Sequence, residues 1–370
     1  MIRILQVGMT RNIGGLETYL MQQFLHLDSK RLTYDFANIT GEYDIAFSDE
    51  ILSSGSRIYG ICSRRRNPLK HYFQWMKLLW EVRGKYQAIV LNALGFEYVF
   101  PLFAAKIFGI PMRVMHSHNS GYEHEIGFLR RVMIEINKFL VRRSVTDYFA
   151  CSQKAGRWMF GDEQPFRMIH NAIDMQKFLF CPTLRKRKRV ELGIEGKFVV
   201  GHVGRFSYQK NHEFLLRIFR KVCDTCSEAV LLLVGDAVGD QSYLLKARDQ
   251  VKQLDMEDKV IFLGMRTDTN ELMQVMDCFV LPSRFEGLPV TGIEAQASGL
   301  SCLFADTITQ EIAITSLANF CSLDDDTEAW AKKILDFRDA PRRDMTEEIT
   351  KAGYNIENVV DELYDLFCVS

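Results

Sequence analysis

Short apolar runs alternate with helix-like segments along most of the chain, and this alternation restricts the fold more than any other feature. Many of the runs end at Gly, Asp or Ser, and they are typical of buried strands. They are IRILQVG, YQAIVLNA, MRVMHSH and DYFACS, followed by KFVVGHVG, AVLLLVGD, KVIFLG, CFVLPS and SCLFA. Strands separated by helices form parallel sheets, so we expect an α/β fold with two Rossmann-like domains that face each other across a cleft. Ligands of such sheets bind outside the carboxyl ends of the strands.

The chain is long enough for two domains, because 370 residues exceed what one ordinary core holds. The alternation stops between residues 167 and 194, where Pro182 and a basic run replace it. We expect a linker there, with an N-terminal domain over 1–170 and a C-terminal domain over 171–354. The segment 355–370 has the apolar spacing of an amphipathic helix, which can pack back on the first domain or stay on the second.

Composition excludes several classes of protein. A hydrophobic fraction of 47%, a charged fraction of 25% and only eight prolines are typical of a folded chain. No run reaches the roughly 20 apolar residues that a transmembrane helix needs. The opening MIRILQVGM resembles a first strand more than a signal peptide, so we expect a cytoplasmic protein. The nine scattered cysteines then predict reduced thiols in the core.

The first strand leads into MTRNIGGLETYL, a glycine turn before a helix. Gly14 and Gly15 let the backbone approach a ligand, and exposed amides at a helix start favour an anion. The pattern is neither G-x-G-x-x-G nor a P-loop, so a dinucleotide dehydrogenase is disfavoured. A purely structural turn is the alternative.

Two cations follow the first strand of the second series. Arg205 and Lys210 lie in GHVGRFSYQKN, where both can converge on a diphosphate. The alternative is that both are solvated loop cations.

The stretch SRFEGLPVTGIEAQASG sets Glu286 in a turn and Glu294 in the helix that follows. Carboxylates accept hydrogen bonds and sugar or ribose hydroxyls donate them, so the pair suits two ends of one sugar-containing ligand. A helix-capping glutamate with a second, surface glutamate is the alternative.

Together, GGLE, GRFSYQKN and SRFEGLPVTGIEA resemble the motifs of one family. They are similar to those of the retaining, nucleotide-sugar-dependent glycosyltransferases of family four, which have the GT-B fold, and within it to members of bacterial capsular and exopolysaccharide biosynthesis. The resemblance runs from about residue 2 to residue 365 and includes HSHN at 116–119 and HNAID at 170–174. One motif departs from the family, since GDAVGD at 235–240 lacks its usual Gly-x-Gly.

The resemblance implies a role for each motif. Arg205 and Lys210 hold the diphosphate with a backbone amide of Gly15, Glu294 binds the nucleotide ribose, and Glu286 binds hydroxyls of the transferred sugar. The implied catalytic residues are His118, Glu286, Arg205 and Lys210. The implied donor-binding residues are Gly14, Gly15, Arg205, Lys210, Glu286, Gly287, Leu288, Pro289 and Glu294. The implied acceptor-side residues are Glu17, His116 and Asn119.

The activity that the resemblance implies is transfer of a hexose or N-acetylhexosamine from a nucleotide diphosphate sugar. UDP is the expected nucleotide, and a growing glycan or a polyprenyl-linked saccharide is the expected acceptor. The family mechanism is front-face substitution with retention, in which the leaving diphosphate helps to deprotonate the acceptor. It implies no metal and no cofactor, and we expect no nucleic-acid partner. The literal D-x-D at Asp324–Asp326 precedes a helix-like segment and predicts an N-cap.

Two rival functions stay open. One is a GT-B phosphorylase or a sugar-nucleotide epimerase, although a glycogen-type phosphorylase needs a pyridoxal phosphate lysine, of which the sequence shows no sign. The other is a non-catalytic sugar-nucleotide-binding partner. The glycine turn and the two histidines, His116 and His118, favour an enzyme over that partner.

Charge is distributed unevenly. Residues 1–165 hold 21 Lys and Arg against 15 Asp and Glu, whereas residues 166–370 hold 25 against 32. In the first part, residues 64–85 join a basic cluster to a helix-like stretch with aromatic side chains. Basic residues beside aromatic ones suit a helix on an anionic membrane, so we expect peripheral contact at the inner face of the membrane. The alternative is that the aromatic residues pack on the first sheet.

Overall fold

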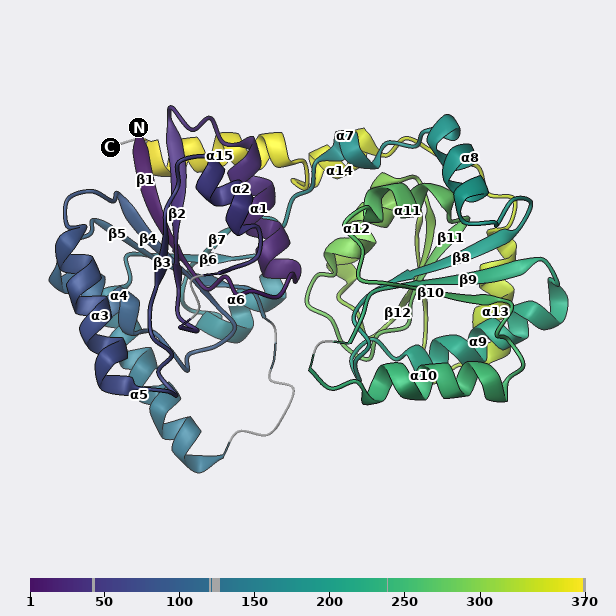
Figure 1. Ribbon diagram of the computed structural model, residues 1–370, viewed down its shortest axis with the longest axis horizontal. Helices are drawn as coiled ribbons and strands as arrows, with labels where there is room; N and C mark the ends of the chain where they lie inside the picture. The colour runs from purple at the N-terminus through teal and green to yellow at the C-terminus, as the bar shows by residue number, and fades with distance from the viewer. Residues whose placement is uncertain (42–43, 120, 122–126, 238, 369–370) are drawn as a thin grey trace. The chain divides into compact units, whose positions relative to one another are not determined.

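The computed structural model describes residues 1–41, 44–119, 121, 127–237 and 239–368. The chain forms two compact units (Figure 1). Met1–Ala172 and Ile356–Ser370 form the first, here called the N-terminal unit, and Ile173–Asn355 forms the second, the C-terminal unit. The chain thus enters the second unit two residues after the boundary that the sequence indicated.

Seven strands form the sheet of the N-terminal unit, in the order β3-β2-β1-β4-β5-β6-β7. All neighbouring strands are parallel. The order reverses between β1 and β4, which makes the carboxyl ends of these two strands the switch point of the sheet. The strands are β1 (Ile2–Val7), β2 (Leu32–Asn38), β3 (Ile58–Gly60), β4 (Ala88–Ala93), β5 (Met112–Ser117), β6 (Asp147–Ala150) and β7 (Arg167–Met168).

Helices cover both faces of this sheet, because successive side chains of a strand point to opposite faces. Ile4 and Val90 pack with α1, α2 and α15 on one face, and Leu5 and Ile89 pack with α3, α4, α5 and α6 on the other. The helices are α1 (Gly15–His26), α2 (Ser48–Ser53), α3 (Pro68–Glu81), α4 (Phe100–Ile107), α5 (Phe128–Ser144), α6 (Gln153–Phe160) and α15 (Ile356–Cys368).

The last helix, α15, belongs to the N-terminal unit although the chain reaches it from the C-terminal one. It packs on α1 and β2. The hydroxyl of Tyr364 accepts a hydrogen bond from the backbone N–H of Asp28 at 2.5 Å, and the guanidinium of Arg31 lies 3.9 Å from the ring centre of Tyr364. The sequence left open on which domain this C-terminal helix packs, and the structure shows that it packs on the N-terminal unit.

The C-terminal unit repeats the architecture with six parallel strands in the order β10-β9-β8-β11-β12-β13. Its switch point lies between β8 and β11. The strands are β8 (Phe198–Val203), β9 (Ala229–Val234), β10 (Val260–Gly264), β11 (Cys278–Leu281), β12 (Ser301–Ala305) and β13 (Ala318–Cys321). The helices are α7 (Met175–Phe178), α8 (Pro182–Glu191), α9 (His212–Thr225), α10 (Ser242–Gln253), α11 (Thr269–Val275), α12 (Val290–Ala297), α13 (Thr327–Asp336) and α14 (Thr346–Lys351), with a 3₁₀ turn at Gln310–Ile312.

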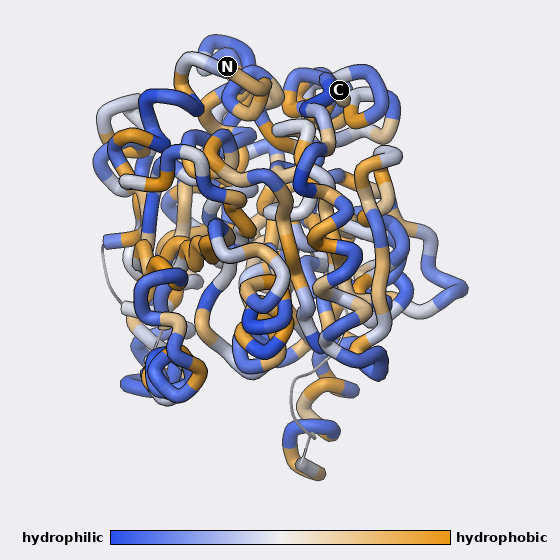
Figure 2. The backbone as a smooth tube through the Cα atoms, turned by 90° about the vertical axis from the view of Figure 1, so that its right-hand side faces the viewer, coloured by the Kyte–Doolittle hydropathy of each residue, from blue (hydrophilic) through white to orange (hydrophobic). Residues whose placement is uncertain are grey.

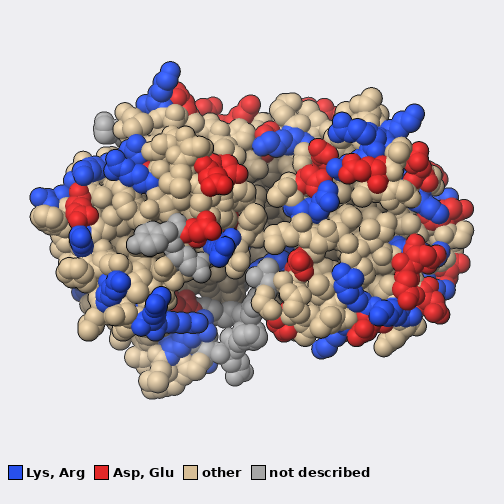
Figure 3. Space-filling model, in the orientation of Figure 1, with Lys and Arg blue, Asp and Glu red and all other residues tan. Residues whose placement is uncertain are grey.

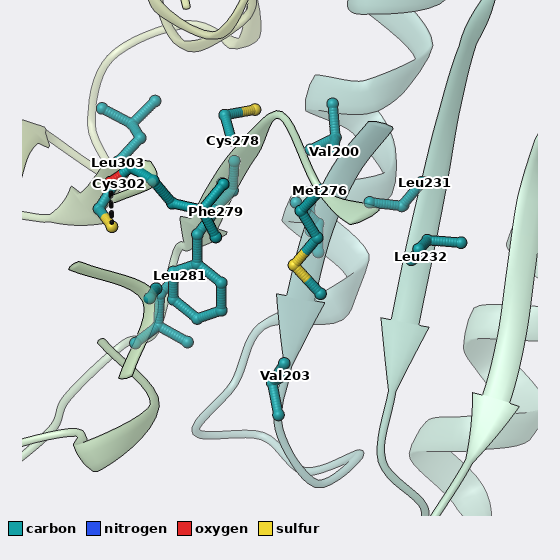
Figure 4. Packing of buried hydrophobic residues seen from close by; sticks show 14 of the residues in the cluster. Val200, Val203, Leu231, Leu232, Met276, Cys278, Phe279, Leu281, Cys302 and Leu303 are labelled. Atoms are coloured by element: carbon teal, nitrogen blue, oxygen red, sulfur yellow. Dashed lines mark hydrogen bonds between the residues drawn. The ribbon is translucent and has the colours of Figure 1, made fainter. Parts of the chain in front are cut away.

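The core of this unit is packed tightly around β8 and β11. Figure 4 shows the side chain of Met276 lying against β8. A Cβ atom on Gly201, in β8, would lie 2.0 Å from the sulfur of Met276, so only glycine leaves room for this side chain. The strands next to the site are therefore fixed by close packing.

The linker expected between residues 167 and 194 is much shorter than the sequence indicated. The chain passes between the units at Ala172 and Ile173, and two helices of the C-terminal unit, α7 and α8, follow at once. Arg185 and Arg189 of α8 bind Asp277 at 2.5 and 2.7 Å, and Lys188 pairs with acids at the start of α11. The basic run is thus an amphipathic surface whose long side chains are held by the unit itself. A hydrophobicity pattern does not reveal a helix of this kind.

Other expectations of the sequence are met. All nine cysteines lie in the described part of the chain, none of them is in a disulfide, and six are buried. Asp326 caps α13 by accepting a hydrogen bond from the N–H of Ala329 at 2.8 Å. Within the described ranges, no helix combines the length and the apolar character that crossing a bilayer demands.

Candidate functional site

The expected donor residues of the C-terminal unit lie at the switch point of its sheet. Residues 204–211 follow β8 and residues 282–289 follow β11; these segments are here called the β8 loop and the β11 loop. The two strands are neighbours in the sheet, so their loops leave it side by side. This is where open α/β sheets bind ligands.

Hydrogen bonds join the β8 loop to the β11 loop. The backbone N–H of Arg284 donates to the carbonyl of Gln209 at 2.8 Å, and the amide of Gln209 donates to the carbonyl of Phe285 at 3.0 Å. The side chain of Asn211 donates to the carbonyl of Pro282 at 3.2 Å. The two segments therefore form one fixed structure rather than two independent loops.

Lys210 and Glu286 meet across this structure. The Nζ atom of Lys210 lies 2.6 Å from Oε1 of Glu286, and Oε2 accepts a hydrogen bond from the Gln209 amide at 3.0 Å. The Lys210 and Glu286 side chains are only 14% and 9% exposed. A largely buried cation and carboxylate in contact can bind an anionic oxygen and a hydroxyl next to each other.

Arg205 differs from Lys210, although both lie in the β8 loop. It is exposed, and it has neither an ion pair nor a side-chain hydrogen bond with any residue that the structure describes. The structure therefore places Lys210 on Glu286 and leaves the guanidinium of Arg205 available for an anion. The convergence of the two cations on one diphosphate stays a prediction.

Glu294 lies in α12, directly after the β11 loop. Its side chain is buried, and burial raises the pKa of the carboxyl to about 7. No described residue forms a hydrogen bond with this carboxyl. The α12 helix begins at Val290, and the residue before it, Pro289, makes no side-chain hydrogen bond that caps the helix. The oxygens of Glu294 are not among the enclosed side-chain atoms without a partner, so the carboxyl can accept a hydrogen bond from a ligand.

Buried polar atoms without partners are concentrated in these two loops and in the residues next to them. Among the described residues of the C-terminal unit, all such atoms but one lie between residues 202 and 212 or between 283 and 291. They are His202 Nε2, both ring nitrogens of His212, Asn211 Oδ1, Ser283 Oγ, Arg284 Nε and Thr291 Oγ1. Native proteins rarely leave buried polar atoms unpaired, so this concentration marks a site prepared for a polar ligand.

The loop after β9 packs against the β8 loop. Gly235 has φ +137°, and a Cβ atom there would lie 2.2 Å from the carbonyl oxygen of Gly204. The N–H of Phe206 donates to the carbonyl of Asp236 at 3.1 Å. The departure from Gly-x-Gly falls at Ala237, which is buried. Gly235, the first glycine of the motif, therefore has a structural role that a residue with a Cβ atom could not fill.

In the N-terminal unit the expected histidines also lie near the switch point. The Nε2 atom of His118 lies 3.0 Å from Oδ1 of Asn92, at the end of β4. The Asn92 amide nitrogen donates to Gln6 and to the carbonyl of Val7, which leaves Oδ1 as the acceptor. His118 therefore carries its proton on Nε2 and has Nδ1 as a free lone pair. Burial lowers the pKa of His118 to about 3, so the ring is neutral.

His116 packs beside His118. The ring centres are 4.0 Å apart, and Tyr19 of α1 contacts both rings edge-on at 5.5 and 5.1 Å. His116 is buried, and its Nε2 has no hydrogen-bond partner among the described residues. Its pKa is far below the usual value because of burial and the neighbouring ring. The two rings thus form a neutral aromatic group fixed by Tyr19.

The helix start at α1 is held by a contact within its own loop. Glu17 is buried, and its Oε1 atom accepts hydrogen bonds from the backbone N–H and the hydroxyl of Thr10 at 3.0 and 2.9 Å. Gly14 precedes α1 and has no side-chain cap, and nothing lies within 4 Å of a Cβ atom placed on Gly15. Glu17 therefore shapes the loop, while the Gly15 backbone is open. Asn119 donates to the carbonyl of Gly121 at 2.6 Å.

Sequence analysis missed two residues of these clusters. Asn92 sets the tautomer of His118, and Gln209 orients Glu286. Asn92 is the second-last residue of the run YQAIVLNA, so its position near a strand end was a usable signal. Gln209 directly precedes Lys210 in the loop after β8. A polar residue at the carboxyl end of a parallel strand is a candidate for a site.

Solved structures of other proteins share this fold. The crystal structure of Anabaena Alr3699/HepE in complex with UDP and glucose aligns with a TM-score of 0.81 at 18% identity, over the whole of both chains. Sucrose-phosphate synthase from Thermosynechococcus elongatus aligns with a TM-score of 0.75 at 15% identity, over 100% of this chain and 98% of that one. The fold is GT-B, as expected.

Sequence comparison adds the family. The profile of the family described as Glycosyl transferases group 1 matches residues 185–356. The putative glycosyltransferase EpsF of Bacillus subtilis is 30% identical over 378 aligned positions, which cover 100% of this chain and 97% of EpsF. The Escherichia coli UDP-Gal:alpha-D-GlcNAc-diphosphoundecaprenol alpha-1,3-galactosyltransferase is 30% identical over 153 positions, 40% of this chain and 38% of that enzyme. The chain belongs to the group 1 glycosyl transferases, and it is a glycosyltransferase.

Proposed function

We propose that the protein is a retaining hexosyltransferase that moves a hexose or N-acetylhexosamine from a UDP sugar to a growing glycan. The observation that carries the proposal is the contact of Lys210 with Glu286, together with the carboxyl of Glu294 in the helix that directly follows the β11 loop. These groups supply a cation for the diphosphate and two acceptors for hydroxyls, which are the features that distinguish a nucleotide sugar.

Relatives support the choice of nucleotide and acceptor. HepE was crystallised with UDP and glucose, and the Escherichia coli enzyme uses UDP-Gal and a diphosphoundecaprenol-linked sugar, as its name states. We therefore propose UDP as the nucleotide and a polyprenyl-linked saccharide as the acceptor, in capsular or exopolysaccharide synthesis. We propose that the enzyme acts in the cytoplasm, at the inner face of the membrane.

The chemistry follows from the residues described. Lys210 and Arg205 stabilise the charge that develops on the leaving diphosphate. Glu286 binds hydroxyls of the transferred sugar, and Gln209 holds its carboxylate in place. No protein nucleophile takes part, because the diphosphate oxygen accepts the proton of the acceptor hydroxyl on the same face. His118 is neutral and offers Nδ1 to a hydroxyl of the bound sugars.

We expect transfer to continue in excess EDTA, because Lys210 and Arg205 supply the positive charge that a metal supplies in other glycosyltransferases. The measurement is the initial rate of transfer with and without EDTA, after dialysis against the chelator. Loss of activity that Mn²⁺ or Mg²⁺ restores would overturn the metal-free mechanism.

The experiment that tests the function is a panel of nucleotide sugars, each scored for thermal stabilisation of the protein and for slow hydrolysis. The proposal expects at least one UDP sugar to stabilise the protein and to be hydrolysed, with release of UDP and of a sugar in the same anomeric configuration. An epimerised donor, or cleavage only with inorganic phosphate, would favour the rival enzymes. Stabilisation without any turnover, even with a polyprenyl-linked acceptor, would favour a binding partner.

A further inference from the structure

The α5 helix carries an exposed apolar stripe. Its large hydrophobic residues on the solvent side are Phe128, Leu129, Val132, Ile136 and Phe139, which are 77%, 82%, 43%, 57% and 54% exposed. At about 100° per residue, these five positions fall within one arc of about 100° on the helix surface. Exposed apolar residues are ordinary when scattered, but a continuous stripe marks an interaction surface.

The opposite side of α5 already has a partner. Ile134 and Val141 are buried in the core of the N-terminal unit, and the Asn137 amide donates to the carbonyl of Phe96 at 2.6 Å. The helix therefore has two apolar sides, one packed on the unit and one facing solvent. Figure 2 shows the beginning of α5 extending away from the sheet of this unit.

A second stripe lies on the same side of the unit. The α3 helix exposes Leu69, Phe73 and Trp80, which are spaced for one helix face, while Trp75 and Leu79 are buried in the core. Since α3 and α5 cover the same face of the sheet, their outer sides point away from it together. Packing on the first sheet, one of the alternatives stated for residues 64–85, is thus confirmed for Trp75 and Leu79, and membrane contact of the exposed side chains stays a prediction.

Basic residues accompany the two stripes. Residues 64–85 and 128–144 together hold twelve Lys and Arg against two Glu. Figure 3 shows Lys and Arg gathered at the lower left, over the region where Figure 1 draws the lower ends of α3 and α5. Arg65, Arg66 and Arg142 have no ion pair with any residue that the structure describes. Two like-charged copies of this surface would repel each other, whereas a surface of opposite charge would attract it.

We propose that the outer side of the α3, α4 and α5 layer lies on an anionic lipid bilayer, with the first two turns of α5 inserted among the headgroups. The apolar stripe enters the interface, and the flanking cations bind anionic headgroups. This deepens the proposed function, on which it rests for the lipid-linked acceptor, and it adds α5 to the contact expected from residues 64–85. Insertion through α5 gives reversible binding that salt weakens.

Co-sedimentation with vesicles of phosphatidylcholine alone, or of equal parts phosphatidylcholine and phosphatidylglycerol, tests the proposal. We expect the full chain to bind only the anionic vesicles at low salt. The paired change Phe128→Ser and Leu129→Ser should reduce the bound fraction at least about fivefold without changing Tm, because both side chains lie outside the core. The matched control is Leu245→Ser with Met265→Ser, at 59% and 60% exposure in the C-terminal unit, which should bind like the wild type.

A second pair of changes separates charge from insertion. Arg142→Gln with Arg143→Gln should weaken binding at low salt and reduce its salt dependence. Equal binding by the wild type and the Phe128/Leu129 variant, or binding to neutral vesicles alone, would overturn the proposal. A dimer in light scattering that this variant converts to monomer would assign the stripe to a second copy instead.

Hydrolysis of a UDP sugar in the absence of vesicles tests the proposed function separately from the proposed membrane surface. The surface variants should hydrolyse the donor at the wild-type rate. If no donor is hydrolysed but the vesicle results hold, the proposed function fails and the membrane surface stands. If hydrolysis is normal and all variants sediment alike, the membrane surface fails and the function stands.

Discussion

Lys210→Ala should lower kcat/KM for the donor by about ten- to a hundredfold, and this is one of the two largest effects we expect. The loss of one charge-assisted contact to the diphosphate costs about 1.5 to 3 kcal/mol. The same change leaves the largely buried carboxylate of Glu286 without its cation, so sugar binding is weakened as well. Initial rates over a range of donor concentrations, at one saturating acceptor concentration, measure the effect.

Lys221→Ala is the matched control for Lys210→Ala. Lys221 also forms an ion pair of 2.6 Å, with Glu328, but both side chains are exposed and lie outside the two loops. Exposed pairs contribute little, so this variant should retain wild-type turnover. Near-normal kcat/KM for Lys210→Ala, or equal losses in the two variants, would remove Lys210 from the donor site.

Glu294→Gln should abolish most transfer while it stabilises the free protein at alkaline pH. An amide keeps the shape of the side chain but replaces one acceptor oxygen by a donor, so ribose hydroxyls lose a charged acceptor. We expect a loss of about ten- to a hundredfold in kcat/KM, as for Lys210. A variant that turns over normally at saturating donor would contradict the assignment of Glu294 to the ligand.

The pH dependence of stability gives Glu294 a second signature. Its folded-state pKa of about 7 lies above the unfolded value, so between roughly pH 4.3 and 7 the folded state binds more protons than the unfolded state. The free energy of unfolding therefore falls as pH rises through this window. Glu294→Gln should remove that decline and be more stable than the wild type by on the order of 1 to 3 kcal/mol at pH 8, but not at pH 4. Denaturant unfolding at both pH values measures it, and an identical pH dependence in the two proteins would contradict the burial of an unpaired carboxyl.

Hydrophobic periodicity predicted the fold where strands are uniformly apolar, and it failed where buried polar groups replace that pattern. The β2 strand is buried throughout although its sequence is LTYDFAN. Asp35 within it is fully buried because Arg3 and the Tyr86 hydroxyl bind its carboxylate at 2.9 and 2.5 Å. Partners from β1 and from the residues before β4 therefore make this strand possible, and a local pattern cannot show them.

The site was predictable to the extent that its motifs are local. Glu286 and Glu294 lie in one strand, turn and helix, so their positions follow from the sequence. The contact of Lys210 with Glu286 joins residues 76 positions apart, and that of His118 with Asn92 joins residues 26 apart. Such pairs depend on which strands are neighbours, and only the strand order of each sheet brings them together.

The most direct test of the donor site compares UDP with uridine, which has the ribose but no diphosphate. Affinities of both ligands would be measured by calorimetry or ligand-observed NMR for the wild type, Lys210→Ala and Glu294→Gln. We predict that Lys210→Ala lowers the affinity for UDP by about tenfold or more and the affinity for uridine by less than about twofold. Glu294→Gln should lower both affinities by a similar factor. If Lys210→Ala lowered the affinity for uridine as much as that for UDP, or if Glu294→Gln left the affinity for uridine unchanged, the assignment of these residues to the diphosphate and the ribose would be wrong.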